Sequence, residues 1–99
     1  MKARLLFEDF EGKAAFEDEA LYQVVIWSVP APVPPTTHGY KYRLLYGRRG
    51  QRLVGYDNER GKGDHKHVGG IESTYVFVSL ARLFDDFRAD VETVSGRKL

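Results

Sequence analysis

Helical periodicity occurs once in this chain, near its C-terminus, and this feature restricts the possible folds more than any other. Ser79 is placed to cap a helix that begins at Leu80. Apolar residues then recur at intervals of three and four, which draws one stripe along the helix. The stripe consists of Leu80, Leu83, Phe84, Phe87 and Val91. A single amphipathic helix needs an apolar surface to cover, so the rest of the chain is expected to supply a sheet.

The segments before this helix are short, rich in β-branched and aromatic residues, and separated by glycine and proline. Strands are predicted at residues 3–8, 21–29, 40–46, 51–57 and 73–78. The run 21–29 is too continuously apolar for a one-sided strand, so it is expected to be central and largely buried. The proline-rich stretch 30–39 is expected to be a rigid connector. The pattern predicts an α+β fold, a mainly antiparallel β-sheet of about five strands with a C-terminal amphipathic helix packed on one face.

Residues 40–57 predict a hairpin around a turn at 47–50. With an even-length turn, the even-numbered residues of the first strand share a face with the odd-numbered residues of the second. An odd-length turn would exchange these faces.

At 99 residues, the chain is expected to form one domain, with a tail that frays after residue 94. A hydrophobic content of 42% and a charged content of 29% are typical of soluble globular proteins. No apolar run approaches the roughly 20 residues that span a bilayer, so a cytoplasmic location without membrane partners is expected. Cysteine is absent, which excludes disulfides, thiolate metal sites and cysteine nucleophiles.

Positive charge is concentrated in the middle of the chain. Residues 41–67 hold eight basic and three acidic side chains, a net charge of +5, whereas the first twenty residues carry −3. A local positive field with tyrosines nearby is the electrostatic pattern expected for a phosphate-bearing partner, most economically nucleic acid. The alternative is a solvated hairpin with no such partner.

Most of the candidate chemistry lies at residues 56–67, which read as a glycine-broken loop. Gly61 and Gly63 allow a sharp turn that would bring Asp57 back towards His65 and His67. In extended backbone, two residues separated by one position point to the same side, about 7 Å apart at their Cα atoms. The two imidazoles are therefore spaced to share a phosphate or a metal ion.

A metal-free nuclease needs a general base, a general acid and cations near the phosphate. His65 and His67 are candidates for the base and the acid, with Arg60 and Lys62 as charge stabilisers. Asp57 completes the candidate catalytic set, and no cofactor is expected. The candidate phosphate-binding or RNA-binding residues are Lys41, Arg43, Tyr56 and Lys66.

Two other hypotheses remain open. A metal-dependent hydrolase would use His65, His67 and either Asp57 or Asp64 as ligands, but the surrounding cations disfavour a metal, so none is predicted. A non-catalytic nucleic-acid-binding or regulatory module would share the basic surface and tolerate loss of the histidines.

Several segments together resemble the TumE family of bacterial toxins. The similarity is carried by the run from Tyr56 to His67, by the opening residues 1–6, by 25–32, by 40–44 and by a final helix that contains phenylalanine. It covers nearly the whole chain and is weakest at residues 11–20 and after Val91. The resemblance implies a growth-inhibiting toxin that a cognate helix-turn-helix antitoxin neutralises. Joined to the charge pattern, it leads us to expect an RNA-directed toxin, an endoribonuclease in the simplest case.

Overall fold

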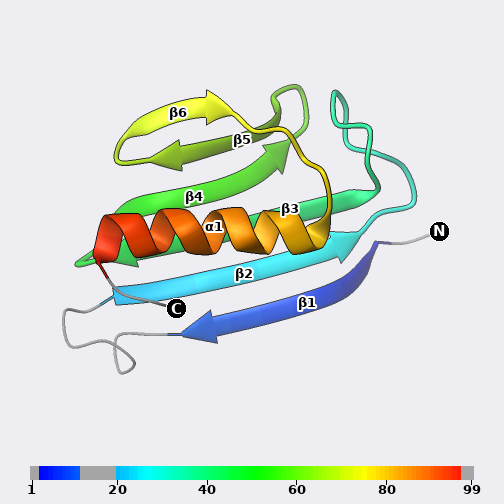
Figure 1. Ribbon diagram of the computed structural model, residues 1–99. Coiled ribbons are helices and arrows are strands. Elements are labelled where there is room, and N and C mark those ends of the chain that lie inside the picture. Colours follow the sequence, from blue (N-terminus) through cyan, green and yellow to red (C-terminus); the bar gives the residue numbers. More distant parts are fainter. Residues whose placement is uncertain (1–2, 12–19, 97–99) are drawn as a thin grey trace.

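The computed structural model describes residues 3–11 and 20–96, which form a sheet with one helix across it (Figure 1). The strands are β1 (Arg4–Glu11), β2 (Ala20–Ser28), β3 (Tyr40–Arg48), β4 (Gln51–Glu59), β5 (Gly63–Val68) and β6 (Ile71–Thr74). Neighbours in the chain are neighbours in the sheet, and all pairs are antiparallel. The predicted α+β class is confirmed, with six strands rather than about five.

Helix α1 (Leu80–Ser95) begins and ends with capping groups, and the first of them, Ser79, is the cap that the sequence predicts. The Oγ of Ser79 accepts a hydrogen bond from the backbone N–H of Arg82 at 3.1 Å. At the other end Gly96 has a φ of 72°, and its N–H donates to the carbonyl of Glu92. The tail was expected to fray after residue 94, but the helix continues to Ser95 and is capped by Gly96; residues 97–99 lie outside the described residues. Among the described helices, none is long and apolar enough to cross a membrane.

The core lies between α1 and the face of the sheet that it covers. Helix residues Leu83, Phe87 and Val91 are at most 3% exposed. They pack on a set of buried sheet residues: Val24, Ile26, Tyr42, Leu44, Tyr46, Val54 and Tyr56. Burial of a large apolar side chain contributes roughly 1.5–3 kcal/mol, so this single layer supplies most of the driving force for folding.

The hairpin of β3 and β4 differs from the even-turn expectation. Its turn does contain two residues, Arg49 and Gly50, which both have positive φ as a type I′ turn requires. A bulge follows, because Gly47 pairs with Arg52 while Tyr46 pairs with Val54. The extra residue exchanges the two faces of β4. Tyr56 therefore points to the helix, and Asp57 points away from it.

The predicted loop at 56–67 is also corrected, since most of it is strand. β4 continues to Glu59, a turn occupies residues 60–62, and β5 begins at Gly63. A second tight turn at Gly69 and Gly70 then leads into β6. The last strand consequently ends at Thr74, and most of the predicted strand 73–78 is non-strand backbone that leads to α1.

Strand β2 is buried on one face only, contrary to the expectation of a largely buried strand. Val24 and Ile26 point into the core, whereas Trp27 is 37% exposed on the other face. No element covers that second face among the described residues (Figure 1). We call the face opposite α1 the open face.

The connector at 30–39 packs against the β4–β5 turn. The backbone N–H of Gly61 donates to the carbonyl of Pro34 at 2.8 Å. Thr36 is buried, and its hydroxyl lies 3.2 Å from Asp64 of β5. The connector therefore belongs to the same domain as the strands that it joins.

Candidate functional site

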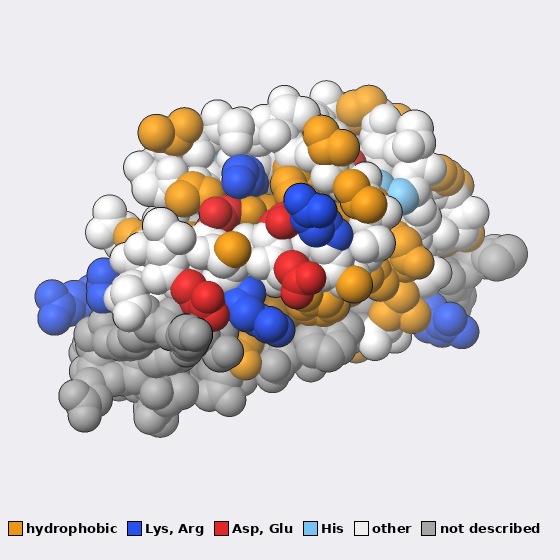
Figure 2. All heavy atoms as spheres, viewed as in Figure 1, with side chains coloured by type: hydrophobic (Ala, Val, Ile, Leu, Met, Phe, Trp, Pro, Cys, Tyr) orange, Lys and Arg blue, Asp and Glu red, His pale blue; other side chains and the backbone are white. Residues whose placement is uncertain are grey.

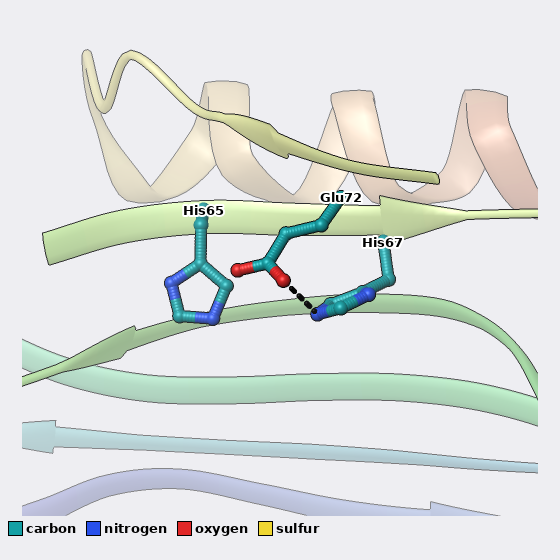
Figure 3. Close-up of side chains that lie close together, drawn as sticks. All are labelled: His65, His67 and Glu72. Atoms are coloured by element: carbon teal, nitrogen blue, oxygen red, sulfur yellow. Dashed lines mark ion pairs between the residues drawn. The ribbon is translucent and has the colours of Figure 1, made fainter. Parts of the chain in front are cut away.

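Strand register brings the two histidines onto the open face with several charged residues. His65 lies between Asp57 of β4 and Thr74 of β6, and His67 lies opposite Glu72 of β6. Cross-strand neighbours point to the same side of a sheet. Figure 3 shows the side chains of His65, His67 and Glu72 on the side of the sheet away from α1.

His65 is held at both ring nitrogens. Its Nδ1 lies 2.9 Å from the carbonyl oxygen of Gly63, which can only accept, so Nδ1 carries a proton. Its Nε2 lies 2.5 Å from Oδ1 of Asp57. That oxygen is buried and accepts no aligned hydrogen bond, so the contact is electrostatic and Asp57 lies beside the direction in which Nε2 points. The His65 side chain is 7% exposed, which fixes its orientation.

His67 and Glu72 form a second and looser pair. The Nε2 of His67 lies 3.5 Å from one carboxylate oxygen of Glu72, as the dashed line in Figure 3 marks. The other oxygen lies 2.5 Å from Nζ of Lys62. The hydrogen bond from Lys62 lowers the pKa of Glu72 from its ordinary value, and the same pairing raises the pKa of Lys62. The His65 and His67 ring centres lie 5.9 Å apart, so both imidazoles can contact one small group.

A groove of about 550 Å³ crosses the open face on the β2–β4 side of the histidines. It is lined by Gln23, Val25, Trp27, Lys41, Tyr42, Arg43, Arg52, Asp57 and Glu59. Asp57 belongs to both the groove and the His65 pair, so the two features adjoin. An exposed indole beside cationic side chains suits a ligand with aromatic rings and phosphates.

Two predicted RNA-binding residues lie on the other side of the sheet. Tyr56 is 1% exposed beneath α1, and its hydroxyl donates to Asp90 of the helix. Lys66 contacts the same carboxylate at 3.3 Å. Burial and the bond to Asp90 raise the pKa of the Tyr56 hydroxyl far above its ordinary value. Tyr56 therefore belongs to the core, Lys66 is half-buried on the helix side, and the structure brings neither residue to His65 and His67.

Asp64, one of the two carboxylates considered as a metal ligand, also lies on the helix side of the sheet. It accepts hydrogen bonds from the Tyr42 hydroxyl at 2.6 Å and from Thr36 at 3.2 Å. The third histidine, His38, contacts it through Nε2 at 2.8 Å. Because Nδ1 of His38 accepts from the backbone of Tyr40, both of its nitrogens are engaged. This cluster joins the connector to β5 and is separate from the open-face site.

The remaining predicted site residues differ in how close they lie to the groove and the histidines. Lys41 and Arg43 line the groove, and Lys62 reaches Glu72. Lys41 also donates through Nζ to the backbone carbonyl of Asn58. Arg60 is exposed in the β4–β5 turn.

Sequence reasoning missed three residues of this face: Trp27, Arg52 and Glu72. Glu72 could have been found from the dipeptide Gly69-Gly70, which is typical of a two-residue hairpin turn. Such a turn places Glu72 directly opposite His67. Arg52 and Trp27 could not have been placed without the bulge in β4 and the one-sided burial of β2.

The helix side of the molecule has a different electrostatic character. Figure 2 shows acidic and basic side chains interspersed along α1, with hydrophobic side chains among them. The helix carries two arginines and four acidic residues. Arg82 pairs with Asp86 at 2.9 Å within this surface. The helix side is therefore a poor surface for a polyanion compared with the groove.

Comparison with known proteins assigns the chain to a family. The family model for Toxin TumE matches residues 4–95, which include every described strand and the helix. No curated protein and no solved structure matches. The match confirms the resemblance carried by the run from Tyr56 to His67. The chain belongs to the TumE toxin family, and it is the toxin of a toxin–antitoxin pair.

Proposed function

We propose that this toxin is an endoribonuclease that binds and cleaves RNA on its open face. The observation that supports the proposal most strongly is the juxtaposition of two imidazoles, each beside a carboxylate, with a cationic groove. The pairs are His65 with Asp57 and His67 with Glu72. Paired imidazoles can exchange protons with a substrate, and adjacent cations can hold its phosphates.

The groove would bind the RNA backbone. Lys41, Arg43 and Arg52 supply the cations, and arginine forks match the geometry of phosphate oxygens. Trp27 is exposed enough to stack on a base. Such contacts read shape and charge, so weak sequence preference and strong salt dependence are expected.

The cleavage step needs one group that takes a proton and one that gives a proton. His65 Nε2 lies 2.5 Å from the Asp57 carboxylate, closer than His67 lies to Glu72, so His65 is assigned as the acid. His67 is more exposed and loosely paired, so it is assigned as the base.

His67 would take the proton of the ribose 2′-hydroxyl, whose oxygen attacks the adjacent phosphorus. The bond from phosphorus to the 5′-oxygen breaks, and that oxygen takes the Nε2 proton of His65. Lys62, together with Arg60 from the same turn, would stabilise the charge on the phosphorus oxygens. The products are a 2′,3′-cyclic phosphate and a 5′-hydroxyl end.

The test is cleavage of a labelled single-stranded RNA by the purified toxin in the presence of EDTA. The account predicts cleavage that chelation leaves intact, with the stated end groups. His65→Ala and His67→Ala should each reduce the rate by about 10²–10⁴-fold, the usual contribution of a general acid or base. Asp85→Asn, an exposed change on the helix, is the matched control.

Either of two outcomes would refute the catalytic assignment. Binding of RNA by the wild type without cleavage would identify a non-catalytic binding module. Cleavage by both histidine variants at the wild-type rate, with the wild-type circular dichroism spectrum, would show that the histidines are not the acid and the base.

An RNA target would place the toxin's action in the cytoplasm.

We further propose that the neutralising antitoxin is a helix-turn-helix protein whose acidic residues cover the open face. The positive groove and the exposed Trp27 offer charge and apolar area to such a partner. Co-expressed toxin and antitoxin should co-elute at low and moderate salt, and Arg43→Glu with Arg52→Glu should weaken the complex. Failure of the wild-type pair to co-elute at either salt concentration would remove this assignment.

A further inference from the structure

We propose that His65, His67 and Glu72 form a binding site for a divalent metal ion, with zinc the best-matched ion. Their candidate ligand atoms all lie within 4.8 Å of one another. Tetrahedral zinc with bonds of about 2.0–2.2 Å requires its ligand atoms to lie about 3.3–3.6 Å apart. His67 Nε2 and a Glu72 oxygen are already 3.5 Å apart, so ion binding requires the ligand nitrogen of His65 to close a separation of at most 4.8 Å from them.

The orientation of His65 is the one that metal-bound histidines adopt. Such histidines generally donate their second ring N–H to a carbonyl or carboxylate, which fixes the tautomer and the ring. Nδ1 of His65 donates in this way to the carbonyl of Gly63 at 2.9 Å. Nε2 is then left as the ligand atom. The His65 side chain that carries it is only 7% exposed.

A buried carboxylate oxygen near Nε2 also lacks an aligned partner. Oδ1 of Asp57 is buried, lies 2.5 Å from Nε2 of His65 and accepts no aligned hydrogen bond. A divalent ion bound to Nε2 would supply positive charge beside this oxygen. A proton on Nε2 would also supply positive charge beside this oxygen, so the proton and the metal ion compete for one position.

Lys62 supports the site although it is a cation. Its Nζ holds one oxygen of Glu72 at 2.5 Å, and the other oxygen faces His67. The contact fixes the carboxylate with a free oxygen directed at the metal position. The Lys62 side chain is 50% exposed, so water screens much of its repulsion towards a metal ion.

A second group, Asp57, Glu59 and His65, shares one histidine with the first. We favour the group with two histidines because zinc binds imidazole nitrogen more readily than hard divalent ions such as magnesium do. Glu59 and Glu72 are both exposed, but the carboxylate of Glu72 is already held by Lys62 and faces His67. The two groups predict different effects for changes at Glu59 and at His67.

Zinc binding has a consequence for activity that rests on the proposed ribonuclease function. A zinc ion on Nε2 of His65 displaces the proton that the leaving oxygen would receive. Zinc is therefore expected to inhibit RNA cleavage, and chelation should restore it. Binding itself does not depend on the cleavage proposal.

The test is calorimetric titration of the chelator-treated full chain with zinc chloride. Wild type should bind one equivalent, with the thermal midpoint rising on binding. His67→Ala and Glu72→Ala should each weaken binding at least tenfold, whereas Glu59→Gln and Asp85→Asn should match wild type. Cobalt provides a second readout, since a tetrahedral site gives it a visible absorption band that Glu72→Ala should remove.

The site is overturned if wild type binds no zinc, or if the His67 and Glu72 variants bind as wild type does. It is also overturned if Glu59→Gln loses binding while His67→Ala keeps it, because the ion then belongs to the other group. If zinc binds as expected but the chelated wild type cleaves no RNA, the ribonuclease proposal fails and the metal site stands.

Discussion

Asn58 is a single polar residue on which the geometry of the strand ends depends. It is fully buried at the end of β4, where its Oδ1 accepts from the backbone N–H of Tyr42 at 3.0 Å. Its Nδ2 donates to the carbonyl of Tyr40 at 2.7 Å. The side chain thus replaces backbone pairing where β3 and β4 no longer pair directly. The sequence alone does not reveal this role, because asparagine is common in turns and the burial of Asn58 depends on distant segments.

Replacement of Asn58 by alanine is expected to lower the free energy of unfolding by about 2–4 kcal/mol, because two buried backbone groups lose their partners. Urea denaturation measures the change. Glu59→Ala, an exposed neighbour, should stay within about 0.5 kcal/mol of wild type. A loss below about 1 kcal/mol for Asn58→Ala would show that water or backbone movement satisfies these groups.

The pKa of the Asp86 side chain makes the stability of the fold depend on pH. Burial alone would raise its pKa, but hydrogen bonds from Tyr75 and Arg82 outweigh burial and lower the pKa below its ordinary value. A group with a lowered folded-state pKa stabilises the fold above its unfolded pKa, and this contribution disappears as pH falls through the folded value. Carboxyl NMR titration should place the Asp86 midpoint below that of a free aspartate, and Arg82→Ala should raise it. An unchanged midpoint in that variant would contradict the assigned cause.

At the scale of elements, the turns decide which residues meet. Gly61 lies within the β4–β5 turn and Gly63 begins β5, and their φ values are 84° and 76°. A Cβ at Gly61 would meet nothing within 4 Å, whereas a Cβ at Gly63 would lie 3.1 Å from Pro35 of the connector. The two glycines therefore form a matched pair that separates backbone strain from crowding.

Gly61→Ala is expected to cost about 1–2 kcal/mol, the usual penalty for a Cβ in the left-handed region. Gly63→Ala should cost more, because the connector must also move. Thermal or urea unfolding of the two variants gives the comparison. Equal losses would show that the connector yields freely at Pro35.

The elements also explain how far the sequence could predict the site. Helix α1 followed from its apolar stripe and its caps, which are local signals. The shared face of His65 and His67 followed from their spacing, and the closeness of Asp57 from the glycines between them. The faces of β4 did not follow, because the bulge near Leu53 depends on how β3 and β4 pair and has no local signal. Tyr56 was consequently predicted to contact RNA, but it is buried in the core.

At the scale of the whole molecule, the two sides of the sheet carry different kinds of side chains. The helix side buries the apolar residues and carries mixed charge, whereas the open face holds the groove and both His65 and His67. This division predicts that RNA affinity depends on cations of one face only.

Arg43→Ala is expected to weaken RNA binding at all sequences and to reduce the slope of log affinity against log salt by about 0.7, the value for one phosphate contact to a single strand. Arg88→Ala, an exposed change on the helix, should leave the slope unchanged. Fluorescence anisotropy at several salt concentrations provides the measurement. Equal slopes for wild type and Arg43→Ala would exclude the groove as the phosphate-binding surface.

The most direct measurement of the central claim is bacterial growth during induced expression of the toxin without its antitoxin. Wild type and the helix-side variant Asp85→Asn should arrest growth, whereas the His65→Ala, His67→Ala double variant should not, at equal protein levels and with the same circular dichroism spectrum. Growth arrest by the folded double variant would contradict the claim that the toxin acts through the histidines of its open face.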